Sequence, residues 1–286
     1  MTKRIPLFLA FIAAGGLFAV QADAAQTAYV AASAASPSAA CTITAPCTTI
    51  AAGLFSANAG GEVVILDSAT YNEALNITKT VVITAPNRPI IVPPGGSSAF
   101  TLATANVSLS LSGVIIDGNA GTASGINVTN GRNLFVSDTS IRNFTGVGVA
   151  AIYVTPPSGV NFGLFVTGTS TSGNNAGIVA DGSAGGTVRA SVRSSLVSVN
   201  TNGGLIALAN GPGAAVFLLH QVLVQGNGVG IATSGGAGFL VDDSRIIGNS
   251  KGISAGPGSF ILSYGNNNLA GNFGNDGAFT GPVALQ

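Results

Sequence analysis

The chain has 286 residues, with ten basic and ten acidic side chains that give a formal net charge of zero. This balance excludes the basic surface that nucleic-acid binding requires, and it excludes an acidic tail. The mean hydropathy is high, at +0.53. Beyond residue 25, however, every apolar run is short and interrupted by Gly, Asn, Ser or Pro, so we expect a protein that is not integral to a membrane.

The first 25 residues have the parts of an export signal. Lys3 and Arg4 precede an apolar run over residues 7–20, and small residues follow it. This order is typical of a signal peptide, and cleavage after Ala24 or after Ala25 fits equally well. A membrane anchor is the alternative, but the apolar run is short and ends in a cleavage-type sequence. We therefore expect an exported protein that is periplasmic, secreted or held at the cell surface.

The two cysteines, Cys41 and Cys47, lie six residues apart. In an exported chain this spacing predicts a structural disulfide, because an oxidising compartment permits one. Two thiols with no histidine nearby are too few to ligate a metal ion. We expect neither a metal nor a cofactor.

Residues 48–58 (TTIAAGLFSAN) predict a short amphipathic helix with Ile50, Leu54 and Phe55 on one face. We expect the first strands within residues 61–86, a loop over 87–98, and regular repeats from Val107 onwards. A helix before the first strand of a stacked solenoid can cap it, since the end would otherwise expose apolar core and unpaired strand edges.

The sequence repeats itself from Leu134 to Ile253. Each copy has an apolar strand, a small polar turn, a short strand and an Asn, and a third strand then opens with Gly and an aliphatic residue. These pairs recur every 22 to 29 residues, at Gly125–Ile126, Gly148–Val149, Gly177–Ile178, Gly204–Leu205, Gly230–Ile231 and Gly252–Ile253. Such a period indicates one supersecondary unit stacked on itself.

We expect each coil to contribute three strands that pair in parallel with those of the next coil, with right-handed connections. Residues 26–286 then form a single all-β domain, a right-handed parallel β-helix, with residues 264–286 as its C-terminal cap. Glycine-rich stretches at 181–186 and 210–213 join the strand after the Gly–aliphatic pair to the next apolar strand.

These coils, with Val-x-Asp-(Thr/Ser)-x-Ile, then Asn, then Gly-Ile, resemble those of right-handed parallel β-helix proteins of the pectate-lyase-like superfamily. The N-terminal part, with its cysteine pair and the GGEVVILDSATYNEAL strand, is similar to uncharacterised secreted bacterial members, as is the closing SYGNNN. The resemblance covers about Thr27 to Gln286. It implies the architecture but not the chemistry, because this fold carries lyases, hydrolases, esterases and proteins without known activity.

Aligning the coils predicts one column at a turn, formed by Asp138, Gly168, Ser194, His220, Asp243 and Asn266. Tight turns favour residues that adopt a left-handed backbone or bond it locally, and His220 fits as an unusual member. The alternative is that His220, the only histidine, is a catalytic base beside Asp243 of the next coil. The turn interpretation is favoured, because no nucleophile is in reach of His220.

If the chain is an enzyme, its candidate catalytic residues are His220, Asp242, Asp243 and Arg245. Polygalacturonate hydrolases of the superfamily use clustered Asp residues with His-Gly and Arg-Ile-Lys motifs, and neither motif is matched here. Adjacent strand residues point to opposite faces, which argues against Asp242 and Asp243 acting on one bond. A calcium-dependent lyase needs several converging carboxylates, and this is the only acidic pair.

Strand alternation also predicts two outward columns. One contains Asn127, Ala150, Val179, Ile206, Ala232 and Ser254, and the other contains Phe135, Phe165, Ser191, Phe217, Leu240 and Ser263. Both are uncharged and largely apolar, so Phe135, Phe165, Phe217, Val179 and Ile206 are candidates for a surface that docks a second copy, another protein or a polysaccharide. The alternative is that other parts of the chain cover these columns. A sugar-stacking platform is less favoured, because Trp is absent and Tyr is scarce.

Two functions follow from these patterns. The favoured one is a secreted, non-catalytic scaffold or binding protein, because the outward columns lack ionisable groups. The alternative is a lyase or hydrolase that acts on acidic, pectin-type polysaccharides, an expectation that depends on the resemblance in fold.

Overall fold

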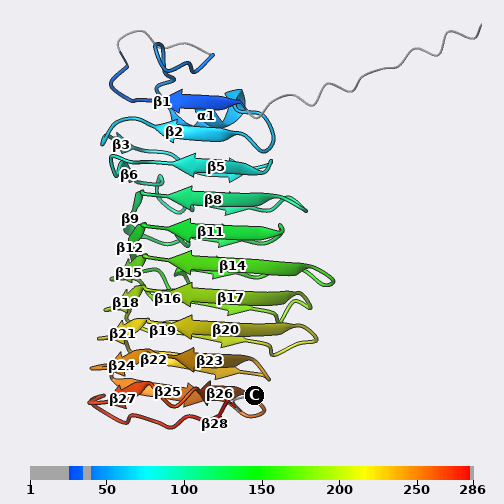
Figure 1. The fold of residues 1–286 in the computed structure, drawn as a ribbon, viewed down its shortest axis with the longest axis vertical. Helices are drawn as coiled ribbons and strands as arrows, with labels where there is room; N and C mark the ends of the chain where they lie inside the picture. Colours follow the sequence, from blue (N-terminus) through cyan, green and yellow to red (C-terminus); the bar gives the residue numbers. More distant parts are fainter. Residues whose placement is uncertain (1–25, 35–39, 284–286) are drawn as a thin grey trace, which may run out of the picture.

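The computed structural model describes residues 26–34 and 40–283, so the expected export signal lies outside the described residues. The chain winds into an elongated right-handed parallel β-helix with three sheets along its length (Figure 1). Within the ranges described, no helix is long and apolar enough to cross a membrane. The predicted architecture of three parallel strands per coil is confirmed.

We name the sheets in the order in which each coil visits them. Sheet A comprises β1 (Thr27–Val30), β2 (Glu62–Ile65), β5 (Val81–Thr84), β8 (Ser108–Ser112), β11 (Asn133–Ser137), β14 (Asn161–Thr167), β17 (Thr187–Arg193), β20 (Ala214–His220), β23 (Gly238–Asp242), β26 (Phe260–Ser263) and β28 (Gly281–Pro282). Sheet B comprises β3 (Thr70–Tyr71), β6 (Ile90–Ile91), β9 (Ile115–Gly121), β12 (Ser140–Phe144), β15 (Ser170–Ser172), β18 (Leu196–Ser198), β21 (Leu223–Gln225), β24 (Arg245–Ile247) and β27 (Asn268–Ala270). Sheet C comprises β4 (Leu75–Ile77), β7 (Phe100–Leu102), β10 (Ile126–Val128), β13 (Ala150–Val154), β16 (Ala176–Asp181), β19 (Gly203–Leu208), β22 (Val229–Ser234) and β25 (Lys251–Ala255).

The regular coils begin before Val107, the position at which the sequence predicts them to start. Strands β2 to β5 already form a complete coil, and β6 lies inside the segment expected to be a loop. Short apolar runs such as Ile90–Ile91 are too brief to show alternation, which explains the difference. The Gly148–Val149 pair was expected to align with Gly125–Ile126 of the preceding coil. It does not, because Ile126 pairs with Ile152 rather than with Val149.

Alternate residues of every strand fill the interior with Val, Ile, Leu and Phe, and polar groups enter it in an ordered way. At the turn from sheet B to sheet C, five asparagines stack from coil to coil: Asn174, Asn200, Asn227, Asn249 and Asn272. Each of the first four donates its side-chain N–H to the carbonyl oxygen of the next side chain, at 2.9 to 3.0 Å. The ladder satisfies buried amides that would otherwise be costly.

Helix α1 (Ile50–Ser56) lies at the N-terminal end of the solenoid beside β1 and β2 (Figure 1). Both of its ends are held by charged side chains. The Glu73 carboxylate accepts the N–H groups of Ile50 and Ala51 at 2.8 Å each, and Lys79 donates to carbonyl groups at the other end. These charges complement the helix dipole. The expected apolar face is only partly right, because Phe55 is 89% exposed.

The cysteine pair protects the first strand edge. Cys41 and Cys47 form the predicted disulfide, and their loop lies along β1. The N–H of Tyr29 donates to the Cys41 carbonyl at 2.7 Å, and the N–H of Ala31 donates to the Cys47 carbonyl at 2.8 Å. These bonds occupy donors of β1 that would otherwise present an open edge to another chain.

Candidate functional site on the outer face of sheet A

The outer face of sheet A, which we call face A, presents three columns of outward side chains. The turn-side column, next to sheet B, contains Ser112, Ser137, Thr167, Arg193, His220 and Asp242. The middle column contains Ser110, Phe135, Phe165, Ser191, Leu218, Leu240 and Leu262. The loop-side column contains Ser108, Asn133, Gly163, Arg189, Val216, Gly238 and Phe260.

A pair of stacked aromatic rings lies in the middle column. The centroids of Phe135 and Phe165 are 4.8 Å apart and their planes differ by 10°. Each side chain is 42% exposed, so the pair forms an apolar shelf open to solvent. Gly163 makes room for it, because a Cβ there would lie 2.8 Å from the Phe165 ring. The exposed position expected for these two phenylalanines is what the structure shows.

Beside the rings is a hollow of about 310 Å³, lined by Phe135, Phe165, Ser191 and Arg193 among others. Arg193 donates from Nε to the Ser191 hydroxyl at 3.3 Å, and both side chains line this hollow. An exposed guanidinium beside aromatic faces suits a ligand that carries carboxylate groups on flat or ring-shaped units.

Arg189 and Arg193 lie four residues apart on β17 and are both exposed. A strand advances by about 3.3 Å per residue, so their backbones are about 13 Å apart on the same face. The sequence reasoning missed both residues, because it considered one outward column for each strand. The alternation within TVRASVR was the signal that could have found them.

His220 and Asp242 are hydrogen-bonded across adjacent coils, with Nδ1 2.7 Å from Oδ2. Asn266 also donates to Asp242, through Nδ2 to Oδ1 at 2.8 Å. The hydrogen bonds from Asn266 and His220 lower the pKa of Asp242. Arg193 precedes His220 in the same column. Three ionisable side chains therefore occupy successive coils at the edge of face A.

The predicted turn column was wrong by one residue at His220 and at Asn266. The left-handed turn position is held by Asp138, Gly168, Ser194, Gln221, Asp243 and Gly265. Gln221 is an unusual residue there, and for that reason the alignment shifted to its neighbour. His220 instead ends β20 and faces outward, so its partner is Asp242 and not Asp243.

Asp243 and Arg245 do not join the pair. Asp243 has a φ of 42° and accepts a bond from Gln221 Nε2 at 3.1 Å. Arg245 begins β24 in sheet B, between Leu223 and Asn268 of the adjoining coils. Of the four candidate catalytic residues, the structure brings together His220 and Asp242.

Both predicted outward columns need correction, and on sheet A Leu262 rather than Ser263 continues the middle column. Phe217 is fully buried and stacks on Phe239 inside the solenoid, with centroids 4.8 Å apart, so Leu218 takes its outward place. On sheet C, Tyr153 replaces Ala150 beside Val179. Val179 is only 5% exposed, and Tyr153 and Ile206 pack over it. Val179 is therefore covered by its neighbours, whereas Ile206 stays partly exposed.

Tyr153 donates to Asp181 Oδ2 at 3.2 Å. Burial and the nearby Asp181 carboxylate raise the pKa of Tyr153 to about 12, so this phenol stays protonated at neutral pH. Its hydrogen bond to Asp181 holds the Tyr153 ring against Val179.

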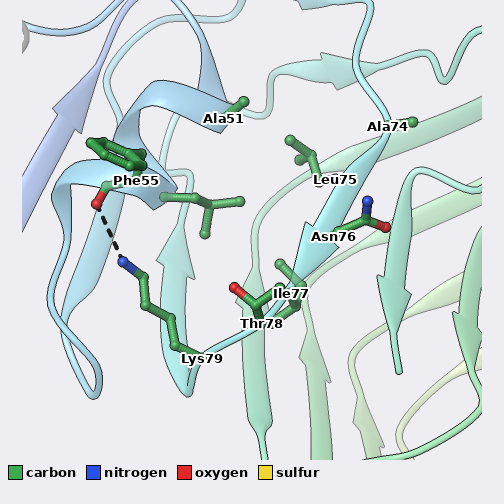
Figure 2. A pocket seen from close by; sticks show the side chains of 9 residues that line it. Ala51, Phe55, Ala74, Leu75, Asn76, Ile77, Thr78 and Lys79 are labelled. Carbon is green, nitrogen blue, oxygen red and sulfur yellow. Dashed lines mark hydrogen bonds between the residues drawn. The ribbon is translucent and has the colours of Figure 1, made fainter. Parts of the chain in front are cut away.

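Two polar features elsewhere have structural roles. Arg142 pairs with Asp117 on sheet B, with Nε 2.8 Å from Oδ2. A second hollow, of about 240 Å³, lies between α1 and β4 (Figure 2). Its charged lining residue, Lys79, donates to the Phe55 carbonyl at 3.3 Å (Figure 2) and is thereby committed to the end of the helix. In the part of the chain that the structure describes, no group of three or more His, Cys, Asp or Glu side chains could hold a metal ion.

No family model and no curated protein matches this sequence. Among solved structures, pectate lyase Pel9A superposes with a TM-score of 0.57 and 14% identity, over 83% of this chain and 67% of that one. The A-module of the mannuronan C-5 epimerase AlgE4 of Azotobacter vinelandii gives a TM-score of 0.37 and 14% identity, over 79% of this chain and 89% of that one. The second score is too low to support an argument. The first shows that this chain has the right-handed parallel β-helix fold of a pectate lyase.

Proposed function

We propose that the chain is an exported, non-catalytic binding protein whose face A holds an acidic polysaccharide. The observation that carries this proposal is the stacked pair Phe135–Phe165 beside Arg193 in one solvent-open hollow. Aromatic rings pack against the apolar faces of sugar rings, and a guanidinium pairs with a carboxylate. The sequence has no Trp and few Tyr, so the two phenylalanines provide the aromatic surface on which a sugar ring would stack.

Two further features support it. The spacing of Arg189 and Arg193 suits a polymer with repeated carboxylates better than a small anion. The Cys41–Cys47 disulfide is what an exported chain is expected to carry. The pectate lyase of similar fold acts on an acidic polysaccharide, and this agrees with the ligand class proposed for face A.

A second function, cleavage of the same ligand, is favoured by one observation. His220 is paired with Asp242 through Nδ1, which leaves Nε2 directed elsewhere, and Arg193 lies one coil away. A histidine base beside a guanidinium that neutralises the carboxylate could remove the proton from the carbon next to that carboxylate. A carbon–carbon double bond would then form as the bond from the adjacent carbon to the glycosidic oxygen breaks, and that oxygen would take a proton from water. Face A would then both bind and cleave the polysaccharide.

Incubation with polygalacturonate and alginate, with and without calcium, separates the two functions. We expect sedimentation with the insoluble calcium gels and no rise in the ultraviolet absorbance of unsaturated sugar products. Absorbance that rises with time in the wild type and is lost in His220→Ala would establish the lyase. Failure to bind any acidic polysaccharide would refute both functions.

A further inference from the structure

The C-terminal half of face A carries a contiguous apolar patch. Its members lie on three successive coils and are each only partly buried: Val216, Leu218, Leu240, Phe260 and Leu262. Contiguous apolar side chains on an outer face often mark a contact surface. The stacked Phe135–Phe165 pair lies outside this patch, towards the N-terminal end of the same face.

The patch combines an aromatic ring with a hollow. The Phe260 ring covers Gly238 of the preceding coil, where a Cβ would collide with it. A hollow of about 390 Å³ lies between β17 and β20 and is lined by Arg189, Val216 and Leu218 among others. The Phe260 ring and the hollow lie on opposite sides of a line that passes between β20 and β23.

We propose that this patch binds a second copy of the chain, related by a two-fold axis that runs parallel to the strands between β20 and β23. This axis places β20 against β23 of the other copy, and β17 against its β26. Each residue then faces a residue of its own column. The proposal goes beyond the proposed function and does not depend on it.

This axis makes the face complementary to itself. In the middle column Leu218 meets Leu240 of the second copy. In the turn-side column His220 meets Asp242 of the second copy, so an imidazole faces each carboxylate and no two carboxylates face each other. In the loop-side column the Phe260 ring meets Arg189 and enters the hollow beside Val216, where a guanidinium over an aromatic ring is favourable.

The other in-plane axis, along the length of the solenoid, is unfavourable. It would place the turn-side column of one copy on the loop-side column of the other. Arg189 would then face Arg193, and like charges across an interface destabilise it. The distribution of charge therefore selects the axis that lies between β20 and β23.

The small area of the contact indicates a weak association. Four coils spaced by about 4.8 Å and about 17 Å of strand give a contact of about 330 Å² per copy in projection. This is small for a specific complex, and such interfaces belong to weak or transient contacts. We expect a dissociation constant of the dimer in the micromolar range.

Sedimentation velocity of the mature protein from about 1 to about 100 μM tests this. We expect the wild type to pass from monomer to dimer, and Leu240→Arg to weaken association at least tenfold while its circular dichroism is unchanged. Leu196→Arg is the matched control, because Leu196 faces outward from sheet B, and it should dimerise as the wild type does. A wild type that stays monomeric, or a Leu240→Arg variant that dimerises normally, overturns the proposal.

Chemical cross-linking tests the geometry, since the described residues contain no free cysteine. A short bismaleimide should join two copies of Leu240→Cys, because the axis passes beside that position. Ser110→Cys lies on the same face but more than about 40 Å from its counterpart across the axis, and it should not cross-link. Equal cross-linking of the two variants would contradict the arrangement. The contact covers Arg189 and Arg193 of the proposed glycan surface, so glycan binding is measured at about 1 μM, where the wild type is monomeric. Glycan binding there with no dimer at about 100 μM refutes the dimer alone, and a dimer without glycan binding refutes the proposed function alone.

Discussion

His220 and Asp242 stand side by side at the edge of face A, with 2.7 Å between Nδ1 and Oδ2, although 22 residues separate them in the chain. Asp242 also accepts from Asn266, and the two hydrogen bonds lower its pKa. The carboxylate is therefore favoured in the folded state.

The Asp242 carboxyl has a lower pKa in the folded protein than in the unfolded chain. Its hydrogen bonds should therefore stabilise the fold at pH values above the unfolded-state pKa, and this stabilisation should be lost as the pH falls through the folded-state pKa. We predict that Asn266→Ala and His220→Ala each raise the pKa of Asp242, as measured by NMR titration of its carboxyl carbon. Asp117, which pairs with Arg142 on sheet B, serves as an internal reference in the same spectra. An unchanged Asp242 titration in both variants would contradict the assigned cause.

The asparagine ladder should be essential for stability. Asn227 donates to the carbonyl groups of Val197 and Gln225 and accepts from Asn200, all within the buried turn. Asn227→Ala leaves these groups unpaired, and we expect a loss of about 3 kcal/mol in the free energy of unfolding. Asn202→Ala, at an exposed position nearby, should change it by less than about 0.5 kcal/mol. Urea denaturation measures both, and equal effects would contradict the role of the ladder.

Val199 should be a site where a substitution stabilises the protein. It has a φ of 56° at a turn position that other coils fill with Gly173, Gly226, Gly248 and Gly271, and its side chain is 62% exposed. A β-branched residue in this conformation is strained by about 1 to 2 kcal/mol. Val199→Gly should therefore raise the free energy of unfolding by about 1 kcal/mol, whereas Val147→Gly, at an exposed position without positive φ, should not. Destabilisation by Val199→Gly would show that the side chain has a packing role.

The disulfide loop should control the exposure of β1. In Cys41→Ser/Cys47→Ser we expect faster hydrogen exchange at the amides of Tyr29 and Ala31, with exchange at Asn227 unchanged. The free energy of unfolding should fall by about 2 kcal/mol, because the cross-link no longer restricts the unfolded chain. Unaltered exchange at Tyr29 would mean that the loop stays in place without its cross-link.

The repeat period revealed the solenoid and its parallel sheets, because each coil repeats the same pattern of apolar strands and turns. The Cys41–Cys47 bridge followed from the short spacing of the two cysteines. The exact register did not follow from the sequence. A glutamine in a left-handed turn at Gln221 shifted the alignment by one residue, and this displaced His220 from the outward column and Phe217 into it. In a strand, such a slip exchanges the inner and outer faces.

The composition of face A was underestimated for a related reason. Arg189 and Arg193 flank the middle column instead of lying in it, so a single column for each strand suggested a surface without charge. The cover of Tyr153 over Val179 could not be predicted either, since it depends on how long side chains lie across neighbouring coils.

The central claim, that face A holds an acidic polysaccharide through Phe165 and Arg193, is tested most directly by calorimetric titration of an oligogalacturonate into the wild type, Phe165→Ala and Arg193→Ala. We predict that each variant binds about tenfold more weakly than the wild type, which corresponds to about 1.4 kcal/mol. Arg132→Ala, a substitution of an exposed arginine outside the hollow, should bind as the wild type does. Equal affinity in all four proteins would contradict the account.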